Sequence, residues 1–221
     1  MIEAKEVTRT FLMGKVEVNA LRGISLNIDK GEFVAIVGSS GSGKTTLLNQ
    51  LGLLDTPTSG QVFIDSTNAS ELTDKQKIRF RLDNLGYVFQ DYALIPTLTG
   101  LENVYLPLMM QGLKQEDVMK KATAILEAVG LADRMHHLPS EMSGGQQQRI
   151  SIARALVHEP KILFADEPCA NLDSEASRQI LELFSRFNKE NEQTIVMVTH
   201  EEWHLDYVDR VINLKDGLIA D

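Results

Sequence analysis

The stretch "FVAIVGSSGSGKTTLLNQL" (residues 33–51) decides the fold of this chain. Five apolar residues are followed by a loop of Gly and Ser and then by a run with helical character. The loop "GSSGSGKT" (38–45) fits the pattern G-x-x-x-x-G-K-[ST] in the strand–loop–helix context that this pattern requires. Consecutive backbone N–H groups from such a loop and from the helix N-terminus point at one spot and favour an anion there. We therefore expect a phosphate-binding loop; a plain Gly/Ser-rich turn is the alternative.

Two side chains of this loop have expected roles in binding a nucleotide. Lys44 would reach the β- and γ-phosphates, and the Thr45 hydroxyl would ligate Mg²⁺. Backbone and side-chain groups along the rest of the loop and the first helical turn would complete the contacts. The predicted phosphate-binding residues are Gly38, Ser39, Ser40, Gly41, Ser42, Gly43, Lys44, Thr45 and Thr46.

A second motif, "ILFADEP" (162–168), places two acids after an apolar run. In open α/β sheets, ligands lie at the carboxyl ends of the strands, which is where Asp166 and Glu167 would stand. Asp166 would hold Mg²⁺ directly or through water. Glu167, on the other side of the strand, would be free to orient a water molecule as a general base. A solvated strand end before the turn at Pro168 is the alternative.

Four short apolar runs have the composition of strands that are buried on both faces of a parallel sheet. They are "FVAIV" (33–37), "YVF" (87–89), "ILFA" (162–165) and "IVMV" (195–198). Apolar residues at helical spacing lie between them, at Val118, Ala122, Ile125, Leu126 and Val129, and at Ala176, Ile180, Leu183, Phe184 and Phe187. Strands that alternate with helices predict an α/β fold with a parallel core sheet.

Two regions depart from this alternation. Ile24, Leu26 and Ile28 alternate with polar residues, which predicts an antiparallel N-terminal β-subdomain with one wet face. Residues 99–158 carry helical patterns without a strand, and Thr99 with Glu102 has the spacing of a capping box. We therefore expect one domain over residues 1–221. In it, residues 1–98 and 159–221 would form the α/β core with its β-subdomain, and residues 99–158 would form an inserted α-helical subdomain.

The composition is that of an ordinary soluble globular protein, with 43% hydrophobic residues among 221. Asp and Glu (31) outnumber Lys and Arg (22), and the resulting net charge of −9 argues against nonspecific binding of nucleic acid. The single cysteine, Cys169, excludes an internal disulfide. The N-terminus lacks the apolar core of a secretory signal, and no apolar run approaches the roughly 20 residues of a membrane helix. A role at a membrane would therefore need a partner.

A third motif, "MSGGQ" (142–146), puts two glycines at the start of the helical run "QQRISIARAL", where glycine costs stability. Ser143 and Gln146 have capping-box spacing, so the stretch could be only a helix start. Alternatively, a ligand presses against the helix N-terminus, and only residues without a side chain leave room for it. We expect that only the second interpretation explains Gly144 and Gly145.

Taken together and in this order, the motifs resemble those of the nucleotide-binding subunit of an ATP-binding-cassette (ABC) transporter, over essentially the whole chain. "MSGGQ" is similar to the signature sequence of that family, and "ANLD" (170–173) looks like its D-loop. "YVFQ" supplies Gln90 as a Q-loop glutamine, and "VTH" supplies His200 as a switch histidine. Phe11 stands where the family usually has an aromatic residue that stacks on adenine. The resemblance implies the P-loop NTPase fold of an ABC cassette.

The resemblance also implies a mechanism. Two copies would pack head to tail around two ATP molecules, each held between the phosphate loop of one copy and the signature of the other. Glu167 and His200 would position and polarise the attacking water and the γ-phosphate, while Gln90 would sense Mg²⁺ and couple hydrolysis to a membrane partner. Contacts from the second copy would come from its signature and D-loop, at Ser143, Gly144, Gly145, Gln146 and Asp173.

The chain would thus be an ATPase that binds ATP and Mg²⁺ and powers separate transmembrane permease subunits, through which it would sit at the cytoplasmic face of the cell membrane. "GLLDTPTSG" (52–60) and "LIPTLTGLENVYLPL" (94–108) are most similar to the branch serving lipoprotein release, macrolide and antimicrobial-peptide efflux and cell-division complexes. That similarity implies export or lipoprotein release. Cys169-Ala170 departs from the Thr-Gly usual in this branch. The resemblance implies that the membrane subunits determine the transported substrate.

Other functions fit the sequence less well. A soluble cassette ATPase that is not engaged in transport, as in DNA repair, would have a long coiled coil between phosphate loop and signature, and no heptad run stands there. A translation-factor protein would need two cassettes in one chain. A phosphate-loop kinase or GTPase would not need the signature, and Glu167 and His200 argue against a non-catalytic binding module. For His200, simple packing is an alternative, because Thr199 and Glu202 have capping-box spacing.

Overall fold

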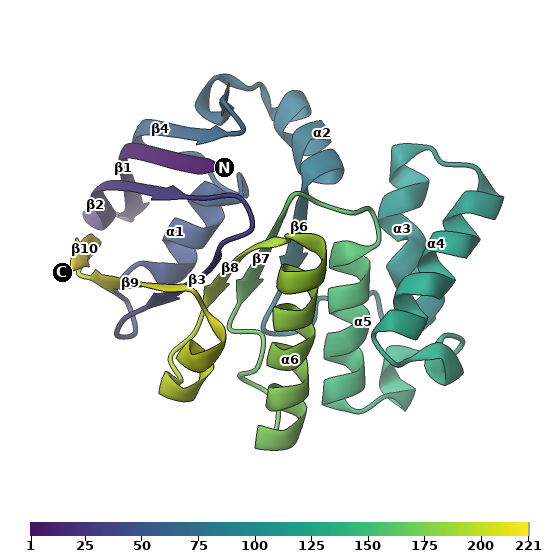
Figure 1. The fold of residues 1–221 in the computed structure, drawn as a ribbon. Coiled ribbons are helices and arrows are strands. Elements are labelled where there is room, and N and C mark those ends of the chain that lie inside the picture. Colours follow the sequence, from purple (N-terminus) through teal and green to yellow (C-terminus); the bar gives the residue numbers. More distant parts are fainter. Residues whose placement is uncertain (221) are drawn as a thin grey trace.

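The structure of the protein, a computed structural model, describes residues 1–220 and contains two β-sheets (Figure 1). The larger sheet has the strand order β10-β9-β3-β8-β7-β6, and the smaller has the order β2-β1-β4-β5. The strands of the larger sheet are β3 (Phe33–Val37), β6 (Leu85–Val88), β7 (Ile162–Asp166), β8 (Thr194–Val198), β9 (Arg210–Lys215) and β10 (Leu218–Ala220). Those of the smaller sheet are β1 (Ile2–Met13), β2 (Val16–Ile28), β4 (Ser59–Ile64) and β5 (Thr67–Asn68).

The larger sheet is the parallel core sheet that the sequence predicts, with β10 added antiparallel at one edge. Side chains alternate between the faces of a strand, so neighbouring residues enter different cores. Val34 pairs with Val196, and both pack against α1 and the smaller sheet. Phe33 pairs with Ile195, and both pack among the helices on the other face. Burial on both faces explains why these strands are unbroken apolar runs in the sequence.

The strand predicted at 87–89 is displaced, because β6 spans Leu85–Val88 and Phe89 lies beyond it. Pairing with β7 ends at Val88. At the other end, Gly86 belongs to the strand although it adds no apolar side chain to the pattern. A Cβ atom at Gly86 would lie 2.3 Å from the carbonyl oxygen of Ala155, so the missing side chain lets the strand approach a helix. The start of β6 thus depends on close packing against the helix, which the hydrophobic periodicity of the sequence does not reveal.

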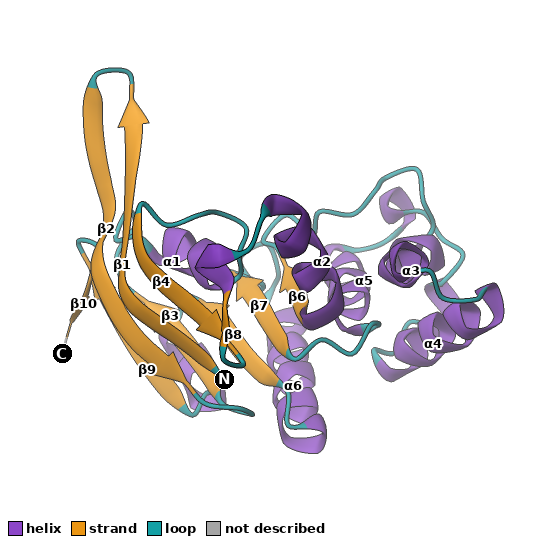
Figure 2. Cartoon of the chain, turned by 90° about the horizontal axis from the view of Figure 1, so that it is seen from above, coloured by secondary structure: helices purple, strands orange, loops and turns teal. Residues whose placement is uncertain are grey.

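The smaller sheet is antiparallel, as the alternation in its second strand predicts. Ile24 and Ile28 are buried, while Ser25 and Asn27 between them are exposed. The hairpin formed by β1 and β2 projects from the body of the molecule in Figure 2. The wet and dry faces of this sheet therefore match the period-two pattern of the sequence.

The helices of residues 1–220 surround the sheets. They are α1 (Lys44–Leu51), α2 (Asp74–Asn84), α3 (Gly100–Gln111), α4 (Gln115–Ala128), α5 (Gly144–Leu156) and α6 (Ser174–Asn191), with short 3₁₀ helices η1 (Ala69–Glu71), η2 (Ala132–Arg134), η3 (Pro139–Glu141) and η4 (Glu202–Tyr207). α1 contacts both sheets, and α3, α4 and α5 stand together at one side of the core sheet (Figure 1). The predicted capping box begins α3, where the Glu102 backbone N–H donates to Thr99 Oγ1 at 3.3 Å.

The sequence pattern did not reveal α2, because that helix offers almost no apolar stripe. Of its eleven residues only Lys77 is buried, and Ile78 is 53% exposed. Its N-terminus is instead secured by a capping box of Thr73 and Gln76. Within residues 1–220, no helix combines the length and the apolar composition that crossing a lipid bilayer requires.

Candidate nucleotide-binding site

The phosphate loop turns directly from β3 into the N-terminus of α1. Gly43 precedes the helix with a φ of 103°, and a Cβ atom there would lie 2.6 Å from the carbonyl oxygen of Ala20, so only glycine fits. Lys44 is 8% exposed, and its Nζ donates hydrogen bonds to the carbonyl oxygens of Gly38 (2.9 Å) and Ser39 (3.0 Å). An ammonium group has three protons, so one donor remains for a phosphate.

A groove of about 520 Å³ opens above this loop. Its floor is the start of α1, its walls include part of β2, and two of the predicted hydrolytic side chains reach into it. The lining residues are Val18, Asn19, Ala20, Gly38, Ser40, Gly41, Gly43, Lys44, Thr45, Thr46, Glu167 and His200. Ser42 is buried inside the loop, with its Oγ away from solvent, so this residue can reach a ligand only through its backbone.

The carboxyl end of β7 brings Asp166 beside the phosphate loop. The Thr45 hydroxyl donates to Asp166 Oδ1 at 3.1 Å, and burial raises the pKa of this carboxyl. A hydroxyl and a carboxylate side by side suit Mg²⁺, which takes one or two protein oxygens together with phosphate oxygens. Among the contacts of residues 1–220, Gln90 does not join this pair. Its side chain is exposed after β6, and its backbone carbonyl accepts a hydrogen bond from Asn171 Nδ2 at 2.9 Å.

Glu167 and His200 come from the ends of neighbouring strands and face each other. Glu167 has a φ of 45°, its backbone N–H donates to the Val198 carbonyl at 3.1 Å, and its Oε2 lies 3.4 Å from His200 Nδ1. His200 is half-exposed, and its Nε2 lies 3.3 Å from Glu201 Oε1. A carboxylate paired with an imidazole at the edge of a phosphate groove can activate water and polarise a phosphoryl group.

The alternative in which His200 merely packs after a strand is wrong, because its side chain is half-exposed in the groove. The capping box that this alternative invoked does not form either. Thr199 Oγ1 accepts from the backbone N–H of Glu201 (3.2 Å) and lies 2.6 Å from Nδ1 of the buried His204. These two contacts occupy the hydroxyl that would have capped a helix with Glu202.

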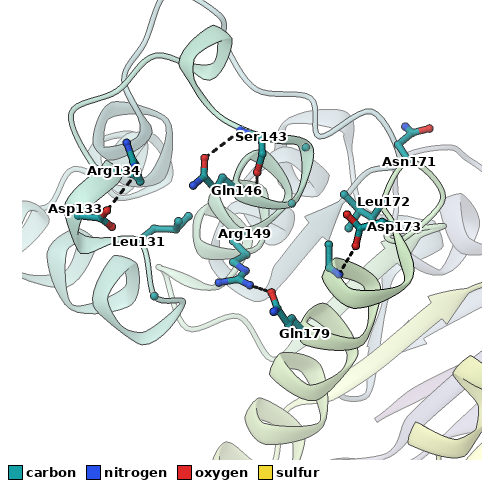
Figure 3. A pocket seen from close by; sticks show the side chains of 14 residues that line it. Leu131, Asp133, Arg134, Ser143, Gln146, Arg149, Asn171, Leu172, Asp173 and Gln179 are labelled. Carbon is teal, nitrogen blue, oxygen red and sulfur yellow. Dashed lines mark hydrogen bonds and ion pairs between the residues drawn. The ribbon is translucent and has the colours of Figure 1, made fainter.

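The signature residues line a second pocket, of about 460 Å³, shown in Figure 3. The capping box predicted there forms: the Gln146 backbone N–H donates to Ser143 Oγ at 3.3 Å, and the Ser143 N–H donates to Gln146 Oε1 at 3.0 Å. Asp173 lines the same pocket and caps α6 by accepting from the Ala176 N–H at 2.8 Å. The lining of this pocket shares no residue with the phosphate groove.

Neighbouring side chains of the same chain also lie close to the two signature glycines. A Cβ atom at Gly144 would lie 2.8 Å from the hydroxyl oxygen of Tyr92, and one at Gly145 would lie 3.2 Å from Cβ of Ala176. A side chain at either position would need small shifts of Tyr92 or Ala176, and an approaching ligand stays the prediction that explains both glycines. Tyr92 is 52 positions away in the sequence, so no local pattern could have indicated this contact.

The predicted adenine-stacking residue, Phe11, does not line the phosphate groove but lies opposite Val18, which does. Phe11 is paired with Val18 across the β1–β2 hairpin, and the Arg9 guanidinium lies 4.4 Å from the centroid of its ring. Residues 18–20 of the facing strand line the groove, and no pattern in the sequence indicates them. Only the register of the hairpin, which depends on a turn and several bulges, brings them there.

The chain has a glycine-rich loop between β3 and the N-terminus of a helix, and Asp166 and Glu167 stand at the end of the parallel strand β7, which β8 separates from β3. This arrangement, with Thr45 hydrogen-bonded to Asp166, defines a P-loop nucleoside triphosphatase. The family model for ABC transporters matches residues 21–170, which is more than half of the chain. The chain belongs to this family and is an ABC-type ATPase with the α/β fold of an ABC cassette.

Relatives and solved structures agree with this assignment. An uncharacterised ABC transporter ATP-binding protein of Methanocaldococcus jannaschii, MJ1508, is 47% identical over 221 residues, which cover 100% of this chain and 98% of that protein. The macrolide export ATP-binding/permease protein MacB of Chlorobium phaeobacteroides is 48% identical over 220 residues, covering 100% of this chain but 33% of MacB. The chain thus spans about a third of the MacB length.

The fold is similar to a dimeric structure of the ATP-binding cassette MJ0796 from M. jannaschii, described as a post-hydrolysis state bound to ADP and Pi. The TM-score is 0.94 at 43% sequence identity, and the match covers 100% of this chain and 97% of that one. The structure of cbiO1 from Clostridium perfringens, described as part of the ABC transporter complex cbiONQ, matches with a TM-score of 0.89 at 30% identity, covering 100% of this chain and 86% of that one.

Proposed function

We propose that two copies of this chain bind two ATP molecules between them, head to tail, and that hydrolysis releases the copies from each other. One observation carries the proposal: the phosphate groove and the signature pocket lie on the same chain but share no lining residue. A single copy therefore offers each ATP only half of its contacts. The similar MJ0796 cassette is described as a dimer, once with ADP and Pi bound.

In this arrangement, the terminal phosphates lie between two helix N-termini, one from each copy. The start of α1 and Lys44 would contact the β- and γ-phosphates from one copy. The start of α5, with Ser143 and residues 144–146, would contact the γ-phosphate from the other, because unpaired N–H groups and the helix dipole favour negative charge. Asp173, in the same pocket, would approach the second copy's site. Phe11 would stack on adenine at the rim formed by the hairpin.

Hydrolysis would use the pair at the strand ends. Glu167 would accept a proton from the attacking water, and His200, 3.4 Å away, would orient that water and the γ-phosphate. When bound, Mg²⁺ supplies neutralising charge at the phosphates, and Thr45 and Asp166 would hold it. Gln90 would reach this site from the exposed turn after β6 and report its state.

Gln90 also lies at the junction of two parts that we propose move relative to each other. Residues 99–158 would act as a helical signature subdomain, and residues 1–98 with 159–221 would act as the ATP-binding core. Their contact includes the buried Gln148 of α5, whose Nε2 donates to the Pro168 carbonyl at 2.6 Å. Because Pro168 follows Glu167 directly, this hydrogen bond connects the signature helix α5 to the residue next to the hydrolytic carboxylate.

A membrane permease would bind at an apolar groove of about 380 Å³ between α2, α3, β6 and α5. Its lining residues are Leu54, Ile78, Arg81, Leu82, Leu85, Gly86, Tyr87, Phe89, Ala93, Pro107, Met110, Arg154, Ala155 and His158. Ile78 and Met110 are 53% and 60% exposed and line this groove together, and a contiguous exposed apolar patch marks a site of interaction with a partner. We assign this apolar groove to a helix of a separate permease subunit. The MacB relatives, by their name, carry a permease in the same chain as the ATP-binding part.

The permease would place this chain at the cytoplasmic face of the cell membrane. We further propose export or lipoprotein release as the transport task, on the similarity to macrolide export proteins. A soluble ABC-type ATPase not engaged in transport is the competing function, and the exposed apolar groove disfavours it. The net charge of −9 gives no reason to expect nucleic acid as a partner.

Replacing Ser143 by Arg tests the head-to-tail dimer. The larger, positively charged side chain would project into the signature pocket, so we expect ATP to bind to the monomer with unchanged affinity while ATP-driven dimers disappear. Calorimetry measures the first and size exclusion with Mg²⁺-ATP the second. The change removes a capping box, which costs about 1 kcal/mol of stability.

Thr73→Arg is the matched control for this experiment, because Thr73 forms the same kind of capping box on α2, far from the signature pocket. It should lose similar stability and still dimerise. Normal dimers in Ser143→Arg would show that the signature does not close the ATP site of a second copy.

Replacing Met110 by Asp tests the permease assignment. A carboxylate in the apolar groove would be desolvated by an incoming helix at a cost of several kcal/mol, so co-purification with the membrane subunit should be lost. ATP affinity should be unchanged, because Met110 does not line the phosphate groove. The control is Ile219→Asp, another exposed apolar residue (38%) on β10. Equal loss of the membrane partner in both variants would contradict the assignment.

A further inference from the structure

A second histidine follows the switch histidine and is unused by the mechanism above. His204 belongs to η4 and is 3% exposed. Its Nδ1 lies 2.6 Å from the hydroxyl oxygen of Thr199, which is also buried. Thr199 immediately precedes His200, so this imidazole is attached to the loop that carries the proposed catalytic histidine.

The Thr199 hydroxyl has a second contact besides the one with His204. Thr199 Oγ1 accepts from the Glu201 backbone N–H at 3.2 Å. The hydroxyl then has its own proton to donate, and Nδ1 of a neutral imidazole can accept it. Burial lowers the pKa of His204, which keeps the ring neutral. The two hydrogen bonds of the Thr199 hydroxyl therefore connect residue 199 to the backbone of Glu201 and to the His204 ring. His200 lies between residues 199 and 201, so these bonds clamp the backbone on both sides of it.

Both ends of this clamp are anchored. η4 packs against α6, and the Trp203 ring meets the His204 ring edge-on with centroids 4.3 Å apart. The His204 backbone N–H also donates to the Glu201 carbonyl at 3.2 Å. On the side of the core sheet, the Thr199 backbone N–H donates to the Ile36 carbonyl of β3 at 3.2 Å. Only the segment between these anchors, with His200, extends into the groove.

Packing alone does not hold that segment. A cavity of about 160 Å³ lies behind the reacting side chains, and its lining includes Glu167, His200 and His204 together with Cys169. Burial raises the pKa of the Cys169 thiol to about 12, so this group remains neutral and serves as a packing residue. Because the cavity leaves space beside Glu167 and His200, the orientation of the loop depends on its hydrogen bonds.

We propose that His204 is a positioning residue for ATP hydrolysis, which holds the 199–201 loop through the Thr199 hydroxyl so that His200 faces Glu167 and the γ-phosphate. The inference rests on the roles proposed above for His200 and Glu167. It goes beyond them, because it assigns the orientation of the catalytic histidine to a side chain outside the phosphate groove.

Four substitutions in the 221-residue chain test this role through steady-state ATP hydrolysis. His204→Leu keeps an apolar side chain in place but removes the hydrogen-bond partner of Thr199, so kcat should fall about tenfold, the rate equivalent of one lost hydrogen bond, with KM unchanged. His204→Asn, whose Oδ1 can replace Nδ1 as the acceptor, should restore most of that loss. Thr199→Val should match His204→Leu, whereas Thr199→Ser should retain the rate. The double variant His204→Leu/Thr199→Val should be no slower than either single variant, because both remove the same bond.

Val208→Ala is the control for stability, since Val208 follows η4 and packs, like Trp203 of η4, on the apolar core that contains α6 residues. It should lower Tm without changing kcat. Wild-type kcat in His204→Leu and Thr199→Val would overturn the proposal, and so would a loss in His204→Leu that Asn does not restore. If His204→Leu does not fold, the comparison of Thr199→Val with Thr199→Ser decides the question. A lower kcat in Thr199→Val alone supports the proposal, and equal kcat in the two variants overturns it.

His200→Ala, measured in parallel, separates this inference from the proposed function. A slow His200→Ala together with a fast His204→Leu means that only the role of His204 is wrong. Full turnover in His200→Ala means that the proposed role of His200 is wrong, and the positioning role then fails with it.

Discussion

Replacing Glu167 by Gln is expected to slow ATP hydrolysis by about a hundredfold to ten-thousandfold, the usual contribution of a general base, and to leave a dimer that ATP stabilises. Glu167 is the carboxylate that faces His200 in the phosphate groove. An amide of the same shape preserves packing but does not take a proton from water, so nucleotide binding survives while cleavage of the terminal phosphate does not. A phosphate-release assay measures kcat, and size exclusion with Mg²⁺-ATP detects the dimer.

The matched control is Glu202→Gln, which makes the same chemical change at an exposed carboxylate on η4. Its turnover should equal that of the unchanged chain, and its dimers should separate after hydrolysis. Undiminished turnover in Glu167→Gln would refute the assignment of this residue as the base. Slow turnover without an ATP-stabilised dimer would leave the base in place but contradict the head-to-tail arrangement.

Lys44→Ala is expected to have the second large effect, a loss of ATP affinity of about 30- to 150-fold, or about 2–3 kcal/mol of binding free energy. The ammonium group is held by the carbonyl oxygens of Gly38 and Ser39 at the centre of the loop, close to where the phosphates would lie. Without it, the backbone N–H groups of the loop remain, but the charge that neutralises the terminal phosphates is gone. Calorimetric titration of the chain with ATP measures the change.

A Lys→Ala change outside the groove controls for the loss of net charge. Lys161 is paired with Asp65 on the surface, with Nζ 2.8 Å from Oδ2. Lys161→Ala should bind ATP like the unchanged chain, because surface pairs are weak and this one is remote from the groove. Equal ATP affinity in Lys44→Ala and the unchanged chain would remove the basis for the phosphate-loop assignment.

Much of the fold could be predicted because the relevant contacts are local or periodic. The buried runs that became β3, β7 and β8 are apolar on both faces, and this composition alone indicates a parallel sheet. The capping boxes at Thr99 and Ser143 join residues three positions apart, so their spacing is sufficient. α2 escaped prediction because its stability depends on a cap and on neighbours, with little burial of its own.

The candidate site could be predicted in part for the same reason. Each motif by itself predicts one residue near Mg²⁺, Thr45 in the phosphate loop and Asp166 at the end of β7. The fold brings Thr45 Oγ1 and Asp166 Oδ1 to 3.1 Å from each other, although 121 positions separate the two residues. The wall formed by residues 18–20 was missed, because the register of a bulged hairpin determines which residues face the groove. The packing of Tyr92 against Gly144 could not be predicted either, because no sequence pattern connects two residues so far apart in the chain.

The amino-acid sequence by itself determined the phosphate loop, the acids that end β7 and the helix starts, because each of these depends on residues within a few positions of one another. Only the tertiary structure decided that the phosphate groove and the signature pocket are separate, that the Thr199 hydroxyl lies beside His204, and that Gly144 lies against Tyr92. These features depend on how sheets and helices pack, and packing joins side chains whose separation along the chain carries no pattern.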